Sequence, residues 1–330
     1  MPSQRRLRQM IAAQPDGLRA VASLDVSACA ERLRPARRLY IVGTGTSFHA
    51  AQLGAYLLSS GGIDAQAVSS SEFARWRPAL ADGDGVVVIS HTGETAYART
   101  VCAQVMAAGR PLVTITGERA GWSDAIETPT WELSETYTVS YTAALGVLGL
   151  LAHALTGAET GPEALARTAA EVERVITGPG LQIAVPGRAL ALVGPGIWAV
   201  TAHEGALKIR EAAHILAEGF DSESLLHGAA VPYGAGDTLI ALAADSDADG
   251  LTAGLVAAAR AEGVTTHQLV GPGPGGPSSA AALFLAQLPL TVRLQLLAAQ
   301  LADAKGTDPD HAITGAWAAP GLWSTGAPGD

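Results

Sequence analysis

Residues 39–47 read LYIVGTGTS, an apolar run that ends in a glycine-rich turn. A helical stretch rich in Ala and Leu follows to about Ser60. The same order returns at residues 86–95, VVVISHTGET, before another helical stretch that ends near Gly109. Leu112 to Ile115 form a third apolar run. Continuous apolar strands that alternate with helices indicate a parallel sheet covered on both faces.

The second half of the chain repeats this plan. Leu190 to Val193 form an apolar run that ends at the turn Gly194-Pro195-Gly196, and we expect one long helix from about Ala199 to Gly219. A strand, a glycine turn, a helix, a strand, a helix and a strand therefore occur in this order twice, which predicts an α/β chain with two similar domains. The remaining elements predicted here are strands at 238–242 and 265–270 and a helix near 248–262.

The expected domain boundaries follow from a helix of about 15 residues near Glu163 to Thr177 that is flanked by Gly and Pro. Residues 3–34 are expected to be amphipathic and helical, with an interruption at Pro15. The Gly-, Pro- and Ala-rich end of the chain is either an ordered strap or a loose tail. We therefore place a helical lead-in at 1–36, a first domain at 37–158, a connecting helix at 159–187, a second domain at 188–305 and a tail at 306–330.

Composition narrows the class of protein. The 330 residues are 48% hydrophobic and 16% charged, which excludes a disordered chain. The net charge of −10 argues against a nucleic-acid partner, since phosphate backbones attract Lys and Arg. Two cysteines, Cys29 and Cys102, provide neither a disulfide scaffold nor a four-thiolate zinc site. The apolar stretch from Thr142 to Leu155 is short for a membrane span, so we expect a cytoplasmic protein with no membrane partner.

The first glycine turn has features that suit an anion-binding site. A turn between a strand and a helix directs backbone N–H groups toward one spot, and the helix dipole adds partial positive charge there. The turn holds Gly45, Thr46 and Ser47, but Phe48 occupies the place of the third glycine of a dinucleotide fingerprint. The Lys of a nucleotide P-loop is absent as well. A plain turn with Thr46 or Ser47 as N-cap is the competing interpretation.

The second loop favours a phosphate ligand. Ser90, Thr92 and Thr95 place three hydroxyls within six residues of a buried strand. In an open parallel sheet, loops at the carboxyl ends of the strands form the ligand crevice. N-capping again competes as an explanation. The matching turns of the second half lack these hydroxyls, so we expect one phosphomonoester site per chain.

A long helix carries the candidate acid and base groups. Glu204, Lys208, Glu211 and Glu218 fall on one helical face at 100° per residue. Taken by itself, this pattern is explained better by a solvated face with Glu–Lys pairs, and a catalytic role requires a pocket that receives one carboxylate. His227 in the following segment is a candidate acid or base, and no metal-binding motif is present.

Taken together, these motifs resemble the sugar isomerase (SIS) family. The residues that carry the resemblance are Gly45-Thr46-Ser47, Ser71-Glu72-Phe73, 90–95 and 204–211, in the family's order, within a resemblance that covers roughly residues 10 to 310. More closely, the chain resembles the isomerase half of glutamine–fructose-6-phosphate aminotransferase and its relatives, the aminosugar-6-phosphate deaminases and deglycases. The resemblance implies two tandem SIS domains, each flavodoxin-like with a parallel five-stranded sheet, and neither a metal nor an organic cofactor.

The resemblance also assigns roles to residues. Glu211 is the implied base between C1 and C2, with Lys208 assisting it. His227 is the implied ring-opening residue, donated across the interface of a homodimer. His91 stands where such enzymes often have Gln. The implied substrate-binding residues are Gly45, Thr46, Ser47, Ser90, His91, Thr92, Thr95, Ser140 and Glu204.

Several positions depart from the family pattern. Trp317 stands where the family has a Lys that closes over the substrate, and Thr142 replaces another family Lys. The sequence printed above includes no glutaminase domain. We therefore expect that this chain draws no ammonia from glutamine. The sequence thus predicts an enzyme on a ketose or aminosugar 6-phosphate that transfers a proton between C1 and C2, with or without gain or loss of ammonia. The alternatives are a non-catalytic phosphosugar-binding regulator and a related reaction on an unusual sugar phosphate.

Overall fold

A computed structural model describes residues 5–76, 80–243, 247–270 and 279–328. The chain divides into two compact units, which are described separately. The first-sheet unit contains Ala13–Leu133, Tyr137–Ala170 and the chain from Ile313 on. The second-sheet unit contains the chain up to Ala12, Ser134–Thr136 and Glu171–Ala312. The domain boundaries expected from the sequence stay a prediction.

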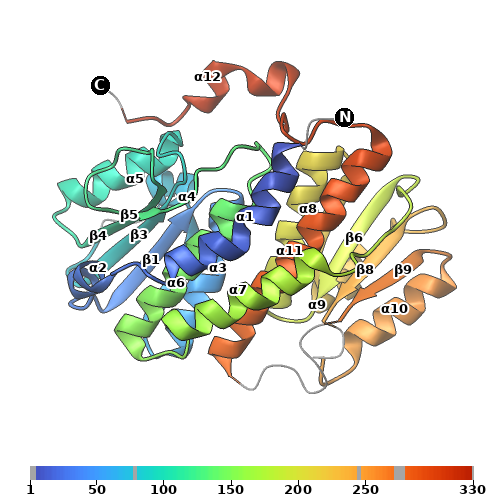
Figure 1. Ribbon diagram of the computed structural model, residues 1–330, viewed down its shortest axis with the longest axis horizontal. Helices are drawn as coiled ribbons and strands as arrows, with labels where there is room; N and C mark the ends of the chain where they lie inside the picture. The colour runs from blue at the N-terminus through green and yellow to red at the C-terminus, as the bar shows by residue number, and fades with distance from the viewer. Residues whose placement is uncertain (1–4, 77–79, 244–246, 271–278, 329–330) are drawn as a thin grey trace. The chain divides into compact units, whose positions relative to one another are not determined.

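The first-sheet unit is built on five parallel strands in the order β2-β1-β3-β4-β5. The chain leaves β1 toward β2 on one side and returns to β3 on the other, so β1 and β3 are neighbours where the direction of winding reverses. Figure 1 shows helices on both faces of this sheet. The strands are β1 (Arg38–Gly43), β2 (Asp64–Ser69), β3 (Asp84–Ile89), β4 (Leu112–Gly117) and β5 (Ala125–Thr128).

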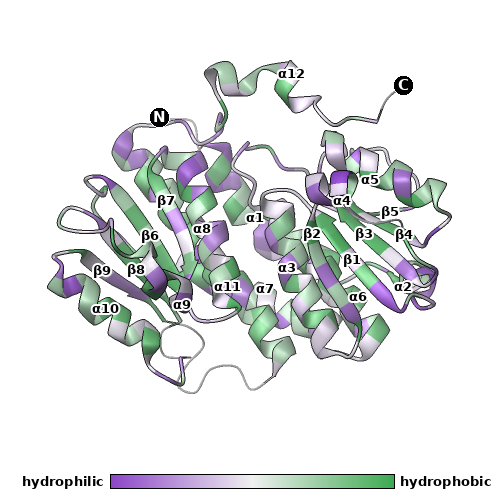
Figure 2. Ribbon diagram, turned by 180° about the vertical axis from the view of Figure 1, so that it is seen from behind, coloured by the Kyte–Doolittle hydropathy of each residue, from purple (hydrophilic) through white to green (hydrophobic). Residues whose placement is uncertain are grey.

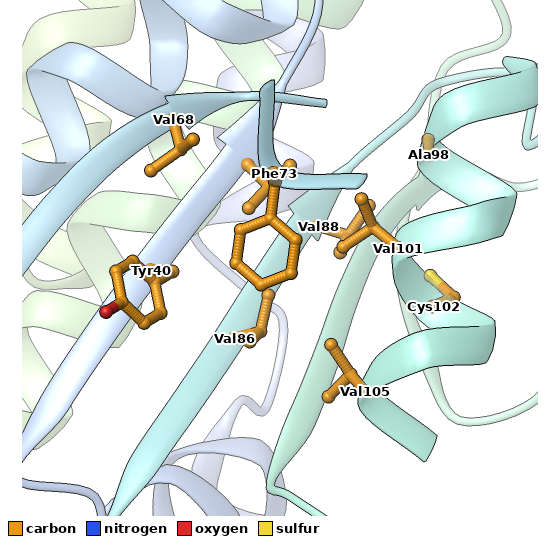
Figure 3. Packing of buried hydrophobic residues seen from close by; sticks show 10 residues of the cluster. Tyr40, Val68, Phe73, Val86, Val88, Ala98, Val101, Cys102 and Val105 are labelled. Carbon is orange, nitrogen blue, oxygen red and sulfur yellow. The ribbon is translucent and has the colours of Figure 1, made fainter. Parts of the chain in front are cut away.

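Apolar packing fixes the helices on this sheet. On one face, Phe73 of the short helix α4 (Ser70–Trp76) meets the Tyr40 ring of β1 edge to face, with ring centroids 5.6 Å apart. Val101 and Val105 of α5 (Ala96–Ala107) extend the same cluster over β3, as Figure 3 shows. This unit also contains α2 (Ser27–Leu33), α3 (Thr46–Ser60) and α6 (Val139–Thr156), while α1 (Arg6–Val21) and α7 (Pro162–Thr177) are divided between the units.

The second-sheet unit repeats the winding. Its parallel strands follow the order β7-β6-β8-β9, so β6 and β8 correspond to β1 and β3. Within the described residues this sheet has four strands rather than the five expected. The elements are β6 (Ala189–Gly194), α8 (Trp198–Ala213), β7 (Leu216–Asp221), α9 (Ser222–Ser224), the π-helix η1 (Leu225–Ala229), β8 (Thr238–Leu242), α10 (Leu251–Ala261), β9 (Thr265–Leu269) and α11 (Ala280–Lys305).

Two helix predictions were wrong in instructive ways. The long helix expected to reach Gly219 ends at Ala213, because His214 adopts a left-handed conformation and the chain then forms β7. Pro15 does not interrupt the N-terminal helix: α1 runs unbroken from Arg6 to Val21. A proline removes one backbone hydrogen bond, and packing around a helix can offset that loss.

Two helices of the described chain are long and apolar enough to cross a membrane, judged by length and composition. They are α6, with 18 residues, and α11, with 26 residues, so the expectation that residues 142–155 are too short was wrong. The apolar windows of α6 and α11 are 78% and 61% buried within the protein. This burial is typical of core helices, as the sequence predicted for α6.

In Figure 2 the hydrophobic colour runs along β3 and β6 of the two sheets.

The last part of the first-sheet unit is an ordered strap, residues 313–328. It contains the 3₁₀-helix η3 (Gly315–Ala318) and the short helix α12 (Pro320–Trp323). The Thr100 hydroxyl of α5 donates a 2.6 Å hydrogen bond to the carbonyl oxygen of Gly326. Gly326 has a φ of +85° and lies so close to the Tyr97 ring that a Cβ would overlap it. The strap is therefore attached to α5 through its main chain.

Replacing Gly219 by Ala tests the close approach of β7 to α8. A Cβ at Gly219 would lie 2.4 Å from the backbone nitrogen of His203, and backbone cannot move aside as a side-chain tip can. We expect Gly219→Ala to lower the free energy of unfolding by about 1–3 kcal/mol in urea denaturation. The matched control is Gly254→Ala on α10, where nothing lies within 4 Å; this change should stabilise the protein by about 0.5–1 kcal/mol. Equal effects would contradict the close approach.

Candidate functional site

The first loop places two hydroxyls at the start of α3. Gly45 is the N-cap residue, with a φ of +56°. Thr46 and Ser47 are the first helical residues, half-buried, so neither is the N-cap that the competing interpretation required. The Ser47 N–H donates to the Thr44 carbonyl at 3.1 Å, which tightens the turn. Both hydroxyl side chains stand at the positive end of the helix dipole of α3.

The second loop gathers its hydroxyls after β3. Ser90 is buried, and its hydroxyl donates to the Thr95 hydroxyl at 3.3 Å. Thr92 accepts a hydrogen bond from the Glu94 N–H at 3.2 Å. Thr95 occupies the N-cap position of α5, but its side chain makes no capping bond. Capping therefore does not account for the three hydroxyls.

The strand pairing joins the two loops. β1 and β3 pair in parallel from Arg38↔Asp84 to Val42↔Val88, so both strands end at the same edge of the sheet. The loops 44–47 and 90–95 therefore leave neighbouring strands at the point where the winding reverses, the usual place for a ligand in such sheets. Two helix N-termini and several hydroxyls at one edge suit a phosphate group.

His91 is held as a neutral ring. Its Nε2 accepts a hydrogen bond from the Glu132 N–H at 3.0 Å. The ring centroid lies 4.8 Å from that of Trp131, and a Cβ at Gly117 would overlap the imidazole. Burial lowers the pKa of His91 to about 4. At neutral pH the ring therefore carries its single proton on Nδ1, as the acceptor role of Nε2 requires.

Ser140 lies at the start of α6 and is buried. Its N–H and its hydroxyl each donate to Glu132 Oε2 at 3.2 Å. The same oxygen accepts from the Thr138 N–H at 2.7 Å. Sequence reasoning did not find Glu132 or Trp131, because neither lies in a glycine turn or on the face of a helix that carries the other charges. A Glu six residues before a helix has no recognised sequence signature.

The charged residues of the second-sheet unit lie on α8. Lys208 and Glu204 are fully buried, with Lys208 Nζ 3.7 Å from Glu204 Oε1. Lys208 Nζ donates to Glu211 Oε2 at 2.5 Å. The Glu211 side chain is 21% exposed, and burial raises its pKa, although Lys208 acts in the opposite direction. A carboxylate with a raised pKa beside a cation is a suitable general base near neutral pH.

The structure separates Glu218 from that group. Glu218 belongs to β7, not to α8, and its carboxylate accepts a hydrogen bond from the Tyr233 hydroxyl at 3.0 Å. Of the four charged residues predicted to share one helical face, three lie on α8: Glu204, Lys208 and Glu211. Glu204 and Lys208 are both buried, and the Glu204 carboxylate is the counter-charge of the Lys208 ammonium group. Its expected contact with substrate stays a prediction.

His227 lies on η1, and its side chain is 72% exposed. Its Nε2 is 3.9 Å from Glu223 Oε1, which is also exposed. Gly228 follows with a φ of +105°, a conformation that glycine adopts without strain. Among the residues that the structure describes, no group of three His, Cys, Asp or Glu side chains is placed to hold a metal ion.

Residues 32–124, which include both hydroxyl loops, match the SIS domain family. These residues are a SIS domain. The resemblance that the motifs indicated is thereby confirmed, and the chain is homologous to glutamine–fructose-6-phosphate aminotransferases. The enzyme named so in Lactiplantibacillus plantarum is 30% identical over 262 residues, 72% of this chain and 43% of that protein. Its counterpart in Bacillus subtilis strain 168 is 29% identical over 304 residues, 83% of this chain and 50% of that protein. The matched part is thus half or less of these relatives.

Solved structures with a SIS-like fold match almost the whole chain. Tagatose-6-phosphate ketose/aldose isomerase of Escherichia coli matches with a TM-score of 0.78 and 16% identity. The match covers 93% of this chain and 96% of the isomerase chain. Glucosamine-6-phosphate deaminase of Thermotoga maritima has a TM-score of 0.76 and 20% identity, with 93% and 97% covered. The C-terminal domain of glucosamine-fructose-6-phosphate aminotransferase of Francisella tularensis has a TM-score of 0.74 and 20% identity, with 94% and 98% covered. The α/β fold with parallel sheets is shared with these proteins.

The lowered pKa of His91 predicts a pH dependence of stability in the SIS domain. Between about pH 6.5 and 4 the unfolded chain binds a proton at residue 91 that the folded chain does not, so stability falls as the pH falls through this window. The loss attributable to His91 is at most about 3 kcal/mol. Urea denaturation at pH 7 and pH 4.5 should show a smaller loss for His91→Gln than for the wild type. Equal losses in both proteins would contradict a neutral, buried His91.

Proposed function

We propose that this protein is a sugar-phosphate isomerase or aminosugar-phosphate deaminase. It acts on a ketose or aminosugar 6-phosphate and transfers a proton between C1 and C2. The observation that carries the proposal is the paired arrangement on α8, where buried Lys208 holds the partly exposed carboxylate of Glu211. The hydroxyl loops of the SIS domain support a phosphorylated sugar as the ligand.

In the proposed mechanism, the open-chain sugar phosphate presents the carbon next to its carbonyl or imine to Glu211. The carboxylate removes a proton from that carbon, and the electron pair of the C–H bond forms the enediol or enolamine double bond. Glu211 then returns the proton to the neighbouring carbon. Lys208 offsets the charge of Glu211 and holds its carboxylate in one orientation, because Nζ and Oε2 lie 2.5 Å apart.

The phosphate supplies the binding energy that orients the reacting carbons. Thr46, Ser47, Ser90, Thr92 and Thr95 donate hydroxyl hydrogen bonds to phosphate oxygens, and charge-assisted bonds of this kind are stronger than neutral ones. When the phosphate is anchored, the sugar chain holds C1 and C2 at a fixed distance from it. The proton transfer then becomes effectively intramolecular.

We propose further that the second sheet belongs to a second, flavodoxin-like SIS domain, since its strand order repeats that of the first. His227 is the ring-opening acid or base and acts in a homodimer. Its exposure supports donation to the site of a partner subunit, and the apolar residues Leu226 and Val231 beside it are exposed as well.

The fate of the amine follows from the chemistry at C2. If the substrate carries a C2 amine, the proton shift yields an imine that water hydrolyses to the ketose and ammonia; the reverse takes up free ammonia. Trp317 stands where the resembled enzymes have a closing Lys, and here it lies in the strap with 79% of its surface exposed. It brings no ammonium group to the substrate, which favours loss of ammonia or simple isomerisation over amination.

Glu211→Gln tests the proposed base. Turnover of the accepted sugar 6-phosphate, and deuterium uptake at C1 or C2 in deuterated water, should fall by about 10²–10⁴-fold, because a positioned general base contributes that much. Binding of the same sugar phosphate should change little, since the amide keeps the shape of the carboxylate. Mass spectrometry after incubation with a panel of hexose and aminosugar 6-phosphates, with and without ammonia, measures both turnover and label.

A loop variant tests the phosphate site that both candidate functions share, and deuterium uptake by the wild type separates the two functions. Ser47→Ala should weaken sugar-phosphate binding and leave the fold intact, whichever function is correct. If the wild type binds a hexose 6-phosphate saturably but incorporates no deuterium from any member of the panel, the protein is a phosphosugar-binding regulator and the isomerase proposal is wrong. Turnover that survives in Glu211→Gln rejects Glu211 as the base.

The acid side of the rate profile reports on Glu211. Only its carboxylate form accepts a proton, and burial raises its pKa. We expect kcat to fall on acidification at a higher pH than an ordinary Glu would cause, by about tenfold per pH unit below that pKa. A rate that stays constant down to the pKa range of an exposed Glu would be inconsistent with a buried base at this position.

A further inference from the structure

Glu132 contacts two predicted binding residues through two different groups. Its main-chain N–H donates to Nε2 of His91 at 3.0 Å. Its side-chain Oε2 accepts from the N–H and the hydroxyl of Ser140, each at 3.2 Å. All three residues belong to the first-sheet unit, and Glu132 itself is buried. None of the roles proposed above involves this residue.

The carboxylate of Glu132 serves as the cap of α6. The helix begins after Thr138, whose side chain makes no capping bond. Glu132 Oε2 instead accepts from the Thr138 N–H at 2.7 Å as well as from Ser140. A negative charge at a helix N-terminus is favoured by the helix dipole and by the unpaired N–H groups there. The cap therefore fixes the Glu132 side chain to the first turn of α6.

The main chain of Glu132 fixes the orientation of His91. A neutral imidazole has one nitrogen that accepts and one that donates, and the Glu132 N–H requires Nε2 to be the acceptor. The neighbouring Trp131 ring lies 4.8 Å away between centroids, and the Tyr137 ring meets His91 edge to face at 6.0 Å. Gly117 leaves room for the imidazole on another side. The donor, Nδ1–H, is thereby set in one orientation.

We propose that Glu132 is a positioning residue of the phosphosugar site, which holds the His91 ring in its Nδ1–H form through its main chain and the Ser140 hydroxyl through its carboxylate. The proposal deepens the proposed function and rests on it for the ligand. Loss of the carboxylate releases the chain at residue 132 from α6. The N–H at that residue then no longer meets Nε2 in a fixed geometry.

The test follows the tautomer of His91 in the ligand-free protein. Long-range ¹H–¹⁵N spectra of protein labelled at its eight histidines show which ring nitrogen carries the proton, and the signal missing from His91→Gln identifies His91. In the wild type at pH 7 we expect a single form with the proton on Nδ1. In Glu132→Ala we expect averaged signals from both tautomers. Titration with inorganic phosphate and with fructose 6-phosphate should show binding weakened by about tenfold or more, the effect of about one lost hydrogen bond.

Two conservative variants separate positioning from bulk stability. Glu132→Gln keeps an oxygen that accepts the Thr138 and Ser140 N–H bonds, so the tautomer should stay that of the wild type and binding should change by less than about threefold. The Glu132→Asp side chain is one methylene shorter and should show the effects of Glu132→Ala in milder form. If the Ala variant does not fold, the His91 tautomer and phosphate binding are measured on Glu132→Asp. The control Glu127→Gln changes an exposed carboxylate on β5 and should alter neither readout.

The outcomes are distinct. A Glu132→Ala or Glu132→Asp protein with a lower melting temperature but an unchanged His91 tautomer and unchanged phosphate binding would show that Glu132 only caps α6, and would overturn the proposal. If the wild type binds neither probe, the proposed function fails. The tautomer of the ligand-free variants still decides whether Glu132 holds His91.

Discussion

The parallel pairing of β1 with β3 is the constraint on which the candidate site depends. Because the chain passes from β1 to β2 before it crosses back to β3, the two strands become neighbours although they are separated in sequence. Their carboxyl ends bring the turns at Gly45 and Ser90 to one edge of the sheet. Neither turn alone distinguishes an anion site from an ordinary helix start. Their adjacency favours an anion site, because it combines two helix N-termini with hydroxyls from both loops.

Electrostatics divides the candidate groups between two environments. In the first-sheet unit, His91 is neutral and the candidate anion-binding groups are hydroxyls and helix N-termini, so these groups are dipoles and not cations. In the second-sheet unit, burial of Lys208 between Glu204 and Glu211 holds an ammonium group among carboxylates. Replacing Lys208 would remove the cation that both carboxylates face, whereas replacing one carboxylate leaves the other to pair with Lys208.

The sequence predicted β1, β3 and β4 of the first sheet and β6, β8 and β9 of the second, because continuous apolar runs and glycine turns are local signals. It missed β2, β5 and β7, which have mixed burial and few β-branched residues. Glu218 was placed on the wrong element, since a 3.6-residue pattern does not reveal that His214 ends the helix in a left-handed conformation. Glu132 was missed because its partners, His91 and Ser140, are brought to it by tertiary packing alone.

The attachment of the strap has an evolutionary consequence. The hydrogen bond from Thr100 of α5 is accepted by the main-chain carbonyl of Gly326, and the close contact there requires the absence of a side chain at that residue, so this attachment depends little on the other side chains of the strap. Substitutions at other positions of the strap, such as Trp317, can accumulate without removing this hydrogen bond. The part of the chain best able to diverge is therefore tied to the helix that follows the second hydroxyl loop, so new substrate preferences can arise while the sheet stays unchanged.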